Sequence, residues 1–233
     1  MEQALPQCET RLGSWLGGRR LAVVIRCLAS LLGAGLLCFA SVQAGVRINQ
    51  IQFVGSHNSY KQAMPAVYLG LLGLLDADAA KALDYQQIPL EQQLDLGLRK
   101  LELDIFYEDK PAKFPVGHVQ VIDMNSHCAT LRECLSRLLA WSERHPTHAP
   151  IWISFNAKDQ PIRWLPKPTP FDAKAFDAMD EVIEAVLGPR LIRPAQVKSP
   201  GQSVPSWPTL SDARGKFLLI LDETGSKRDI YSA

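Results

Sequence analysis

The sequence lacks an excess of charge of either sign. It has 25 Lys and Arg residues against 24 Asp and Glu residues, so its formal net charge is +1. Nucleic-acid-binding domains usually carry a clear basic excess, so this balance argues against one. The mean hydropathy of −0.03 excludes a protein with several membrane spans. Fifteen Gly and sixteen Pro residues are too few for a collagen-like or disordered chain, and no internal repeat or low-complexity tract occurs.

Long apolar runs are also scarce. The main one, Cys27–Ala40, is shorter than the ~18 residues that suggest a spanning helix. A basic segment with Arg19 and Arg20 precedes it, and the small-x-small tripeptide Val42-Gln43-Ala44 follows it. This order is typical of a secretory signal peptide. We therefore expect residues 1–44 to be a signal peptide cleaved after Ala44, with an uncleaved anchor as the alternative.

Cysteine is sparse in the remaining domain, residues 45–233. Of the five cysteines in the chain, only Cys128 and Cys134 lie beyond the expected cleavage site. Export to the periplasm or the medium would place them where disulfides persist. An even pair so close in sequence predicts a disulfide that closes a small loop, and two reduced core thiols are the alternative.

Five segments of this domain have the apolar and β-branched composition of strands. They are Val46–Val54, Lys100–Tyr107, Val116–Ile122, Ile151–Phe155 and Lys216–Asp222. Helical patterns lie between them: Ala66–Ala80, a segment from Pro89, a segment opened by a Thr130–Glu133 capping box, and Asp172–Leu187. Strands that alternate with helices predict an α/β fold with a mainly parallel sheet.

Two further assignments concern the surface. The Leu-rich segment Val67–Leu75 is interpreted as a helix that packs on the core, with an apolar rim for lipid substrates as the alternative. His127, His145 and His148 lie in polar sequence beside helices, and we expect all three on the surface.

Polar side chains recur at the ends of the expected strands. His57 and Asn58 follow the first strand, and Asn156 and Lys158 follow the fourth. Because residues two apart on a strand share a face, Glu102 and Asp104 on the second strand should project together.

Two neighbouring carboxylates repel each other unless a cation or a proton lies between them. Oxygen ligands of this kind suit Ca²⁺ or Mg²⁺ better than Zn²⁺. A second histidine, His118, follows on the next expected strand. Two histidines with such a metal could cleave a phosphodiester by acid–base catalysis. Each of these features alone is weak, since such residues are more often structural or exposed.

Four motifs together resemble the phosphatidylinositol-specific phospholipase C-like phosphodiesterases, in particular their secreted, calcium-dependent bacterial branch. They are Gly55-Ser56-His57-Asn58-Ser59-Tyr60, Leu101-Glu102-Leu103-Asp104, Gly117-His118 and Ile153-Ser154-Phe155-Asn156-Ala157-Lys158-Asp159. The resemblance spans about residues 48–222. It implies a TIM-type (β/α) barrel that carries its active site at the carboxyl ends of its strands.

The resemblance also implies a role for each matched residue. His57 would contact the phosphate in the transition state, and His118 would be the acid that protonates the leaving diacylglycerol oxygen. Asn58, Glu102 and Asp104 would bind Ca²⁺, and Mg²⁺ is an alternative. The nucleophile would be the inositol 2-hydroxyl, so the first product would be a cyclic phosphate.

Two positions depart from the family pattern. Eukaryotic members have a Glu where this chain has Asn156, which as a ligand keeps one oxygen but loses a charge. Related glycerophosphodiesterases have a Lys that matches Lys158, so Lys158 is expected to bind the substrate phosphate. Within the same chemistry, glycerophosphodiester or sphingomyelinase D-like cleavage is the alternative activity, and contacts to the head group decide between them.

The length of the chain is the remaining difference from the family pattern. Five expected strands are fewer than the eight of a barrel, which usually takes ~250 residues. We therefore expect a barrel that is incomplete at its C-terminus, with an unpaired edge on its last strand. An inactive secreted remnant is a further alternative. The expected partners are a phospholipid or another phosphodiester and, transiently, a membrane surface, with no nucleic acid and no obligate protein partner.

Overall fold

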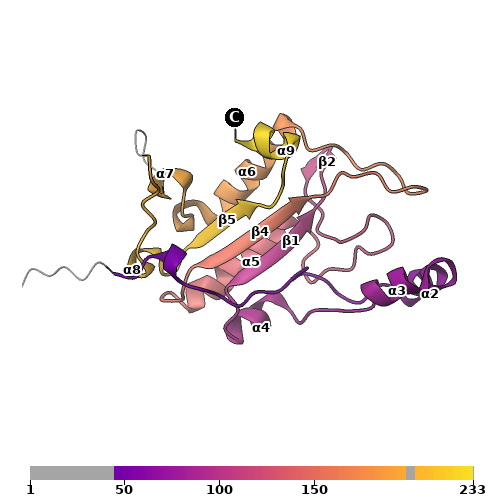
Figure 1. The fold of residues 1–233 in the computed structure, drawn as a ribbon, viewed down its shortest axis with the longest axis horizontal. Coiled ribbons are helices and arrows are strands. Elements are labelled where there is room, and N and C mark those ends of the chain that lie inside the picture. The colour runs from indigo at the N-terminus through magenta and orange to yellow at the C-terminus, as the bar shows by residue number, and fades with distance from the viewer. Residues whose placement is uncertain (1–44, 198–202, 233) are drawn as a thin grey trace, which may run out of the picture. The chain divides into compact units, whose positions relative to one another are not determined.

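The computed structural model describes residues 45–197 and 203–232. The expected signal peptide, residues 1–44, lies outside the described residues. The described chain is centred on a parallel sheet of three strands in the order β1-β4-β5 (Figure 1). These strands are β1 (Lys100–Ile105), β4 (Ile151–Ala157) and β5 (Phe217–Leu221). They confirm three of the five expected strands.

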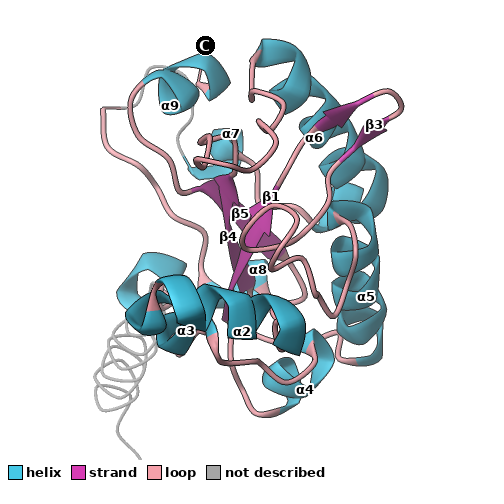
Figure 2. Cartoon of the chain, turned by 90° about the vertical axis from the view of Figure 1, so that its right-hand side faces the viewer, coloured by secondary structure: helices cyan, strands magenta, loops and turns pink. Residues whose placement is uncertain are grey.

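Two long helices cover one face of this sheet, α5 (Leu131–Arg144) and α6 (Ala173–Leu187) (Figure 2). The backbone N–H of Glu133 donates to the Thr130 hydroxyl at 3.3 Å, so Thr130 caps the start of α5. The Asp172 carboxylate accepts from the N–H of Ala175 at the start of α6. Both expected helices are therefore present, and both begin at the expected polar residue.

The sheet separates an apolar face from a polar one. Leu101, Leu103 and Ile105 are fully buried in the same core cluster as residues of α5 and α6. The residues between them, Glu102 and Asp104, point to the opposite face because successive strand side chains alternate. The covered face holds the sheet in place, and the other face carries the polar residues.

The remaining elements are short. They are η1 (Ile48–Gln50), α2 (Ala66–Leu75), α3 (Ala77–Leu83), α4 (Leu90–Asp95), β2 (Glu108–Asp109), β3 (Ala112–Lys113), η2 (Gly188–Arg190), α7 (Pro194–Val197), α8 (Leu210–Ala213) and α9 (Ser226–Tyr231). Strands β2 and β3 form a small antiparallel hairpin. None of the described helices is long and apolar enough to cross a membrane.

The prediction of a strand over Val46–Val54 is wrong. Its first part contains η1, and Arg47 makes only a single bridge to Thr209. The chain reaches the sheet just beyond the expected strand, where Gly55 bridges to Lys100 in parallel orientation. Apolar residues are present, but the segment pairs with β1 too briefly to form a strand.

The prediction of a strand over Val116–Ile122 is also wrong. Val116 makes one antiparallel bridge to Ile105, and the chain then reverses in a turn that pairs Val119 with Asp123. The tight turn, with Val121 at a φ of 71°, prevents an extended conformation over this segment.

The expected helix Ala66–Ala80 is divided into α2 and α3 at Asp76. The Asp76 carboxylate accepts from the N–H of Ala79 and so begins a second helix. No residue of α2 is buried, so the expectation that Val67–Leu75 packs on the core is wrong. Figures 1 and 2 show α2 and α3 lying to one side of the sheet.

His148 is not a surface residue as expected, because only 7% of it is exposed. Its ring packs against Trp141 of α5, and its Nε2 lies 2.7 Å from the hydroxyl of Ser142. Contacts with a helix that precedes it in the chain therefore bury it. His145 is exposed as expected.

Cys128 and Cys134 form a disulfide, with their Cα atoms 5.1 Å apart. The bridge joins the loop before α5 to the first turn of that helix. It therefore ties the loop that follows Asp123 to the covered face of the sheet.

Candidate active site

The loop that carries His57 and Asn58 is fixed to β1 by its neighbours. The N–H of Ser56 donates to the carbonyl of Lys100 at 3.2 Å, and the Ser59 hydroxyl accepts from the N–H of Glu102 at 2.8 Å. Gly55 allows this approach, because a Cβ there would lie 2.7 Å from the Cβ of Lys100. Asn58 has a φ of 47°, a region that Asn tolerates better than most residues.

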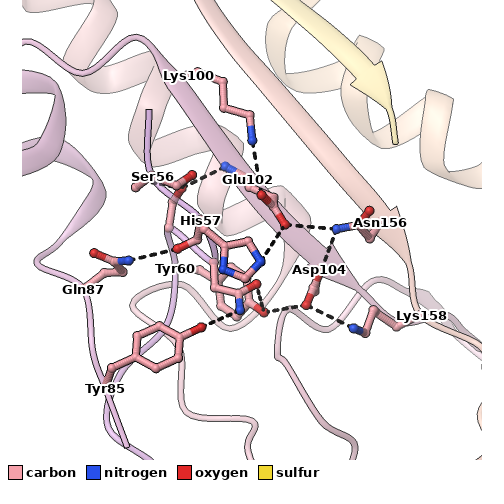
Figure 3. A network of polar contacts seen from close by, with 12 residues as sticks. Ser56, His57, Tyr60, Tyr85, Gln87, Lys100, Glu102, Asp104, Asn156 and Lys158 are labelled. Carbon is pink, nitrogen blue, oxygen red and sulfur yellow. Dashed lines mark hydrogen bonds and ion pairs between the residues drawn. The ribbon is translucent and has the colours of Figure 1, made fainter. Parts of the chain in front are cut away.

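Strand register brings the two carboxylates of β1 beside Asn156 of β4. Asp104 is the direct partner of Asn156 in the parallel pairing, and Glu102 is the partner of Ser154. The Asn156 side-chain amide donates to Glu102 at 3.1 Å and to Asp104 at 2.9 Å (Figure 3). One amide thus lies between two carboxylates that would otherwise repel each other.

Two lysines and a histidine lie beside the same two carboxylates (Figure 3). Lys100 Nζ lies 3.2 Å from Glu102, and Lys158 Nζ lies 3.3 Å from Asp104. His57 Nε2 lies 3.5 Å from Glu102. The carboxylates are themselves nearly buried, so these neighbours offset the cost of removing two negative charges from water.

Two tyrosines complete the network. The Tyr60 hydroxyl donates to Asp104 at 3.0 Å and lies 3.4 Å from the Asn58 side-chain oxygen. Burial, reinforced by the charge of Asp104, raises the pKa of Tyr60 far above its ordinary value, so the hydroxyl stays a neutral donor. The Asn58 amide donates to Tyr85 at 2.6 Å, and burial also raises the pKa of Tyr85.

His118 lies beside a cavity of about 350 Å³ at the carboxyl ends of β4 and β5. Asn156, Lys158 and Lys227 line the same cavity. The backbone N–H of Gly117 donates to the carbonyl of Asp104 at 3.2 Å, which holds the His118 turn next to β1. The cavity and the carboxylate network therefore adjoin each other through Asn156 and Lys158.

All seven expected site residues thus lie in one region. His57, Glu102, Asp104, Asn156 and Lys158 belong to one network of polar contacts, Asn58 joins it through Tyr60, and His118 lines the adjoining cavity. The arrangement places two histidines, a lysine and a group of oxygen donors in one region beside the cavity, and such groups can carry out acid–base chemistry on an anion.

The oxygen donors fit a hard cation. The described residues hold no group of three or more His, Cys, Asp or Glu side chains that could bind a metal ion. They do hold two carboxylates and the side-chain oxygens of two asparagines, the donor types that Ca²⁺ takes. The buried hydroxyl of Ser154, beside Glu102 in register, has no hydrogen-bond partner in the described part of the chain. It supplies a further free oxygen on this face.

Sequence reasoning missed several residues of this region. Tyr60 stands at the end of the motif that contains His57, but its contact with Asp104 depends on a strand more than forty residues away. Tyr85 and Lys100 belong to none of the motifs found in the sequence. Asp123 follows His118 by five positions, and its carboxylate lies 3.2 Å from the ring of that residue, a pairing that a turn between them could have suggested.

Comparison with known proteins identifies a family. The profile of the family described as "Phosphoinositide phospholipase C, Ca2+-dependent" matches residues 46–116 and 109–233. No curated protein sequence matches the chain.

Solved structures similar to this chain include phospholipases C from two bacteria. The calcium-dependent phosphoinositol-specific phospholipase C of a Pseudomonas species, in its apo form, matches with a TM-score of 0.54 and 21% identity over 80% of this chain and 62% of its own. A myoinositol complex of that enzyme matches with a TM-score of 0.51 and 22% identity, over 76% and 58% of the two chains.

The Ca²⁺-dependent phosphatidylinositol-specific phospholipase C of Streptomyces antibioticus matches with a TM-score of 0.53 and 22% identity, over 77% and 58% of the two chains. These similarities show a shared fold. The chain spans about 62% of the length of the first of these structures.

Proposed function

Since the chain belongs to the Ca²⁺-dependent phosphoinositide phospholipase C family, we propose that it hydrolyses the phosphodiester bond of a phosphoinositide lipid with the help of Ca²⁺. The observation that supports this most is the pairing of β1 with β4, which puts Glu102, Asp104 and Asn156 in one network at the carboxyl ends of the strands. The Pseudomonas structure with bound myoinositol supports an inositol head group as the substrate class.

The proposal assigns the metal to Asn58, Glu102, Asp104 and Asn156. When bound, Ca²⁺ would neutralise the phosphate and lower the pKa of the attacking hydroxyl. Ca²⁺ accepts six to eight oxygens in flexible geometry, whereas Mg²⁺ demands a near-ideal octahedron. Two carboxylates and two amides on three separate segments favour the more tolerant ion. Rotation of the Asn156 amide would turn its oxygen toward the carboxylate pair.

The proposed catalytic residues are His57 and His118, with Lys158 as a phosphate-binding residue. The inositol 2-hydroxyl gives its proton to a carboxylate of the site, Glu102 or Asp104, and attacks the phosphorus. The bond from phosphorus to the diacylglycerol oxygen then breaks. His118 gives its proton to that leaving oxygen. His57 and Lys158 donate hydrogen bonds to phosphoryl oxygens as charge develops on them. The first product is a cyclic inositol phosphate, which water opens in a second step.

We further propose that the three-stranded sheet is part of a TIM-type (β/α) barrel. In such a barrel the helices lie on one face of the sheet and neighbouring strands follow chain order. Here α5 and α6 both pack on the same face of the order β1-β4-β5. The opposite face carries Glu102 and Asp104 and corresponds to a barrel interior. A doubly wound sheet would have helices on both faces.

Helix α2 supports contact with a lipid surface. It follows the His57 loop closely in the chain, and Leu74 and Leu75 are 84% and 87% exposed. Val67 and Leu71 are also exposed. Exposed apolar groups on a short helix favour insertion into the headgroup region of a bilayer. We propose that α2 contacts the membrane that holds the substrate, and that the protein meets this membrane after export.

The test is hydrolysis of phosphatidylinositol vesicles, with detection of cyclic inositol phosphate. We expect activity that requires Ca²⁺, is removed by a chelator and is poorly restored by Mg²⁺. His118→Ala should lose about 10²–10⁴-fold, the usual contribution of a positioned acid. His57→Ala should lose about 10²–10³-fold, the usual cost of losing one donor to developing charge. His145→Ala, an exposed histidine outside the site, is the matched control and should keep full activity.

Two outcomes would contradict the proposal. If the protein and both site variants show one common background rate, the chain is an inactive member of its family. If the products are glycerol phosphate or free choline in place of cyclic inositol phosphate, the chain is a glycerophosphodiesterase or a sphingomyelinase D-like enzyme.

A further inference from the structure

A buried ion pair lies behind His118, outside the network of Figure 3. The side chains of Lys61 and Asp123 are both fully buried, and Lys61 Nζ lies 3.0 Å from Asp123 Oδ1. The other carboxylate oxygen, Asp123 Oδ2, lies 3.2 Å from His118 Nδ1. A line of three charged or titratable groups thus runs from the interior of the protein to the cavity.

Both the side-chain ammonium and the backbone of Lys61 are held by neighbouring groups. Its Nζ also donates to the carbonyl of Gln62 at 3.3 Å and lies 4.8 Å from the centre of the Tyr85 ring. Its backbone N–H donates to the carbonyl of Asn58 at 2.9 Å. The ammonium therefore has a carboxylate, a carbonyl and an aromatic face as partners, which together replace water around a buried charge.

Asp123 is held by the turn that begins at His118. The N–H groups of His118 and Val119 both donate to the carbonyl of Asp123, at 2.9 and 3.2 Å. Val121 completes this turn with a φ of 71°, a conformation that is costly for a β-branched residue. The turn returns the chain on itself, so that the Asp123 carboxylate faces the ring of His118.

This arrangement determines which ring nitrogen of His118 carries a proton. An ionised carboxylate can only accept hydrogen bonds, so the short contact with Asp123 requires a hydrogen on Nδ1. The other nitrogen, Nε2, has no hydrogen-bond partner among residues 45–197 and 203–232. His118 lines the cavity, and Nε2 is the ring nitrogen left for a substrate.

Stability alone is a poor explanation for the buried pair. Removing two charges from water costs several kcal/mol per ion, and apolar residues of similar size often serve the fold equally well. We propose that Asp123, clamped by Lys61, is a positioning residue that holds His118 with a proton on Nδ1 and with Nε2 directed to the substrate. This inference deepens the proposed phospholipase function, because it says how the chain fixes its general acid.

The pair also accounts for the proton in the proposed reaction. In the proposed step His118 enters with a hydrogen on each ring nitrogen, and the Nδ1 hydrogen is bonded to Asp123. The Nε2 proton passes to the leaving oxygen as its bond to phosphorus breaks. The ring then remains neutral, with its hydrogen still on Nδ1 and still bonded to Asp123, which keeps its charge throughout.

The test begins with the unmodified protein labelled with ¹⁵N in its histidine rings. The signal of His118 is identified by its loss in His118→Ala. At a pH where the ring is neutral, we expect the Nδ1–H tautomer. A ring with its hydrogen on Nε2 would overturn the inference, whatever the activity of the protein.

Asp123→Asn is the informative variant, because an amide of the same shape can donate a hydrogen bond to Nδ1 and so favour a hydrogen on Nε2. We expect the tautomer to switch and kcat on phosphatidylinositol to fall by at least about tenfold, up to the roughly 10²–10⁴-fold that a positioned acid contributes, with KM little changed. His118→Ala combined with Asp123→Asn should be no less active than His118→Ala alone, because Asp123 acts through His118.

Asp109→Asn is the matched control, since Asp109 pairs with Lys174 at the surface and has no contact with His118. It should change neither the tautomer nor kcat. Lys61→Met should weaken the hold on Asp123 and reduce the share of the Nδ1–H form. An unchanged tautomer and rate in Asp123→Asn would overturn the inference. A tautomer that switches in a protein with no lipase activity would instead leave the positioning intact and reject the proposed function.

Discussion

Asn156 is the residue at which the proposed metal site differs most in charge from the eukaryotic pattern. Its amide donates to both Glu102 and Asp104, so in the absence of metal it relieves the repulsion between them. Asn156→Asp would replace this donor by a third negative charge. The metal-free variant should be less stable than the unmodified protein, and Ca²⁺ should stabilise it more strongly, because binding to the folded state adds to stability.

Thermal melting with and without Ca²⁺ measures this effect. We expect a lower melting temperature for metal-free Asn156→Asp, a larger rise on addition of Ca²⁺, and half-saturation at a lower Ca²⁺ concentration. Asn125→Asp is the control, because Asn125 donates only to the carbonyl of Ala63 at an exposed position. Equal Ca²⁺ responses in both variants would remove Asn156 from the proposed ligand set.

His148 gives a prediction for the dependence of stability on pH. Burial lowers the pKa of its ring below the ordinary value of about 6.5. As the pH falls below that value, the unfolded chain binds a proton that the folded protein still excludes, so the free energy of unfolding decreases. Above about pH 7 the contribution of His148 is fully present.

Urea unfolding between about pH 5 and pH 8 tests this prediction. The decrease toward low pH should be smaller in His148→Gln, whose amide does not titrate but can still contact Ser142. His145→Gln should retain the full decrease, because His145 is exposed. The prediction fails if the three proteins lose stability in parallel.

At the scale of elements, α2 gives the clearest prediction. Leu74→Glu and Leu75→Glu place charges where the proposal puts the bilayer surface, so binding to phosphatidylinositol vesicles should weaken at least about tenfold, as expected for the loss of more than 1.4 kcal/mol. Because no residue of α2 is buried, the melting temperature should hardly change. Cosedimentation with vesicles measures the binding.

Leu96→Glu is the matched control for α2. Leu96 is 73% exposed but follows α4, outside the α2 segment. It should bind vesicles like the unmodified protein. Hydrolysis of a water-soluble inositol phosphodiester should be unaffected in the α2 variants, so the membrane contact can be separated from catalysis. Equal vesicle binding in all variants would reject α2 as the lipid-binding element.

The same elements show what the sequence could and could not reveal. The apolar run of β4 and the alternation of apolar and polar residues in β1 predict strands, because each pattern follows from which faces of the strand are buried. Val46–Val54 has similar residues, yet Val54 is 72% exposed, and only a pairing partner could have made that segment a strand. The Leu content of α2 predicts a helix, but composition does not say whether another element covers it.

The grouping of the main site residues was predictable from strand geometry. Glu102 and Asp104 share a face by strand geometry, and parallel strands place their carboxyl ends together, so His57 and Asn156 were expected nearby. Lys61, Tyr85 and Asp123 depend on turns and contacts between distant segments. His148 was placed wrongly because its burial arises from Trp141 and Ser142 of α5, contacts that its polar sequence neighbours do not indicate.

At the scale of the whole molecule, the outer edge of β5 is the feature with the widest consequence. Leu191 bridges to Phe217 at the start of this edge, and no other described residue pairs with the edge beyond it. Ile220, in register with Ser154, is 41% exposed on the face that carries the site. An unpaired strand edge with an exposed apolar side chain is a template for association with another chain.

We therefore expect residues 1–233, taken by themselves, to self-associate through β5 as their concentration rises, and Ile220→Lys to reduce that association by adding a charge beside the edge. Sedimentation velocity over a range of concentrations measures the effect. Ile230→Lys is the matched control, since Ile230 on α9 has a similar exposure of 39% but lies away from the edge. Loss of association in Ile220→Lys alone would identify the edge as the contact. Equal behaviour of the two variants would mean that general surface charge, and not strand pairing, controls association.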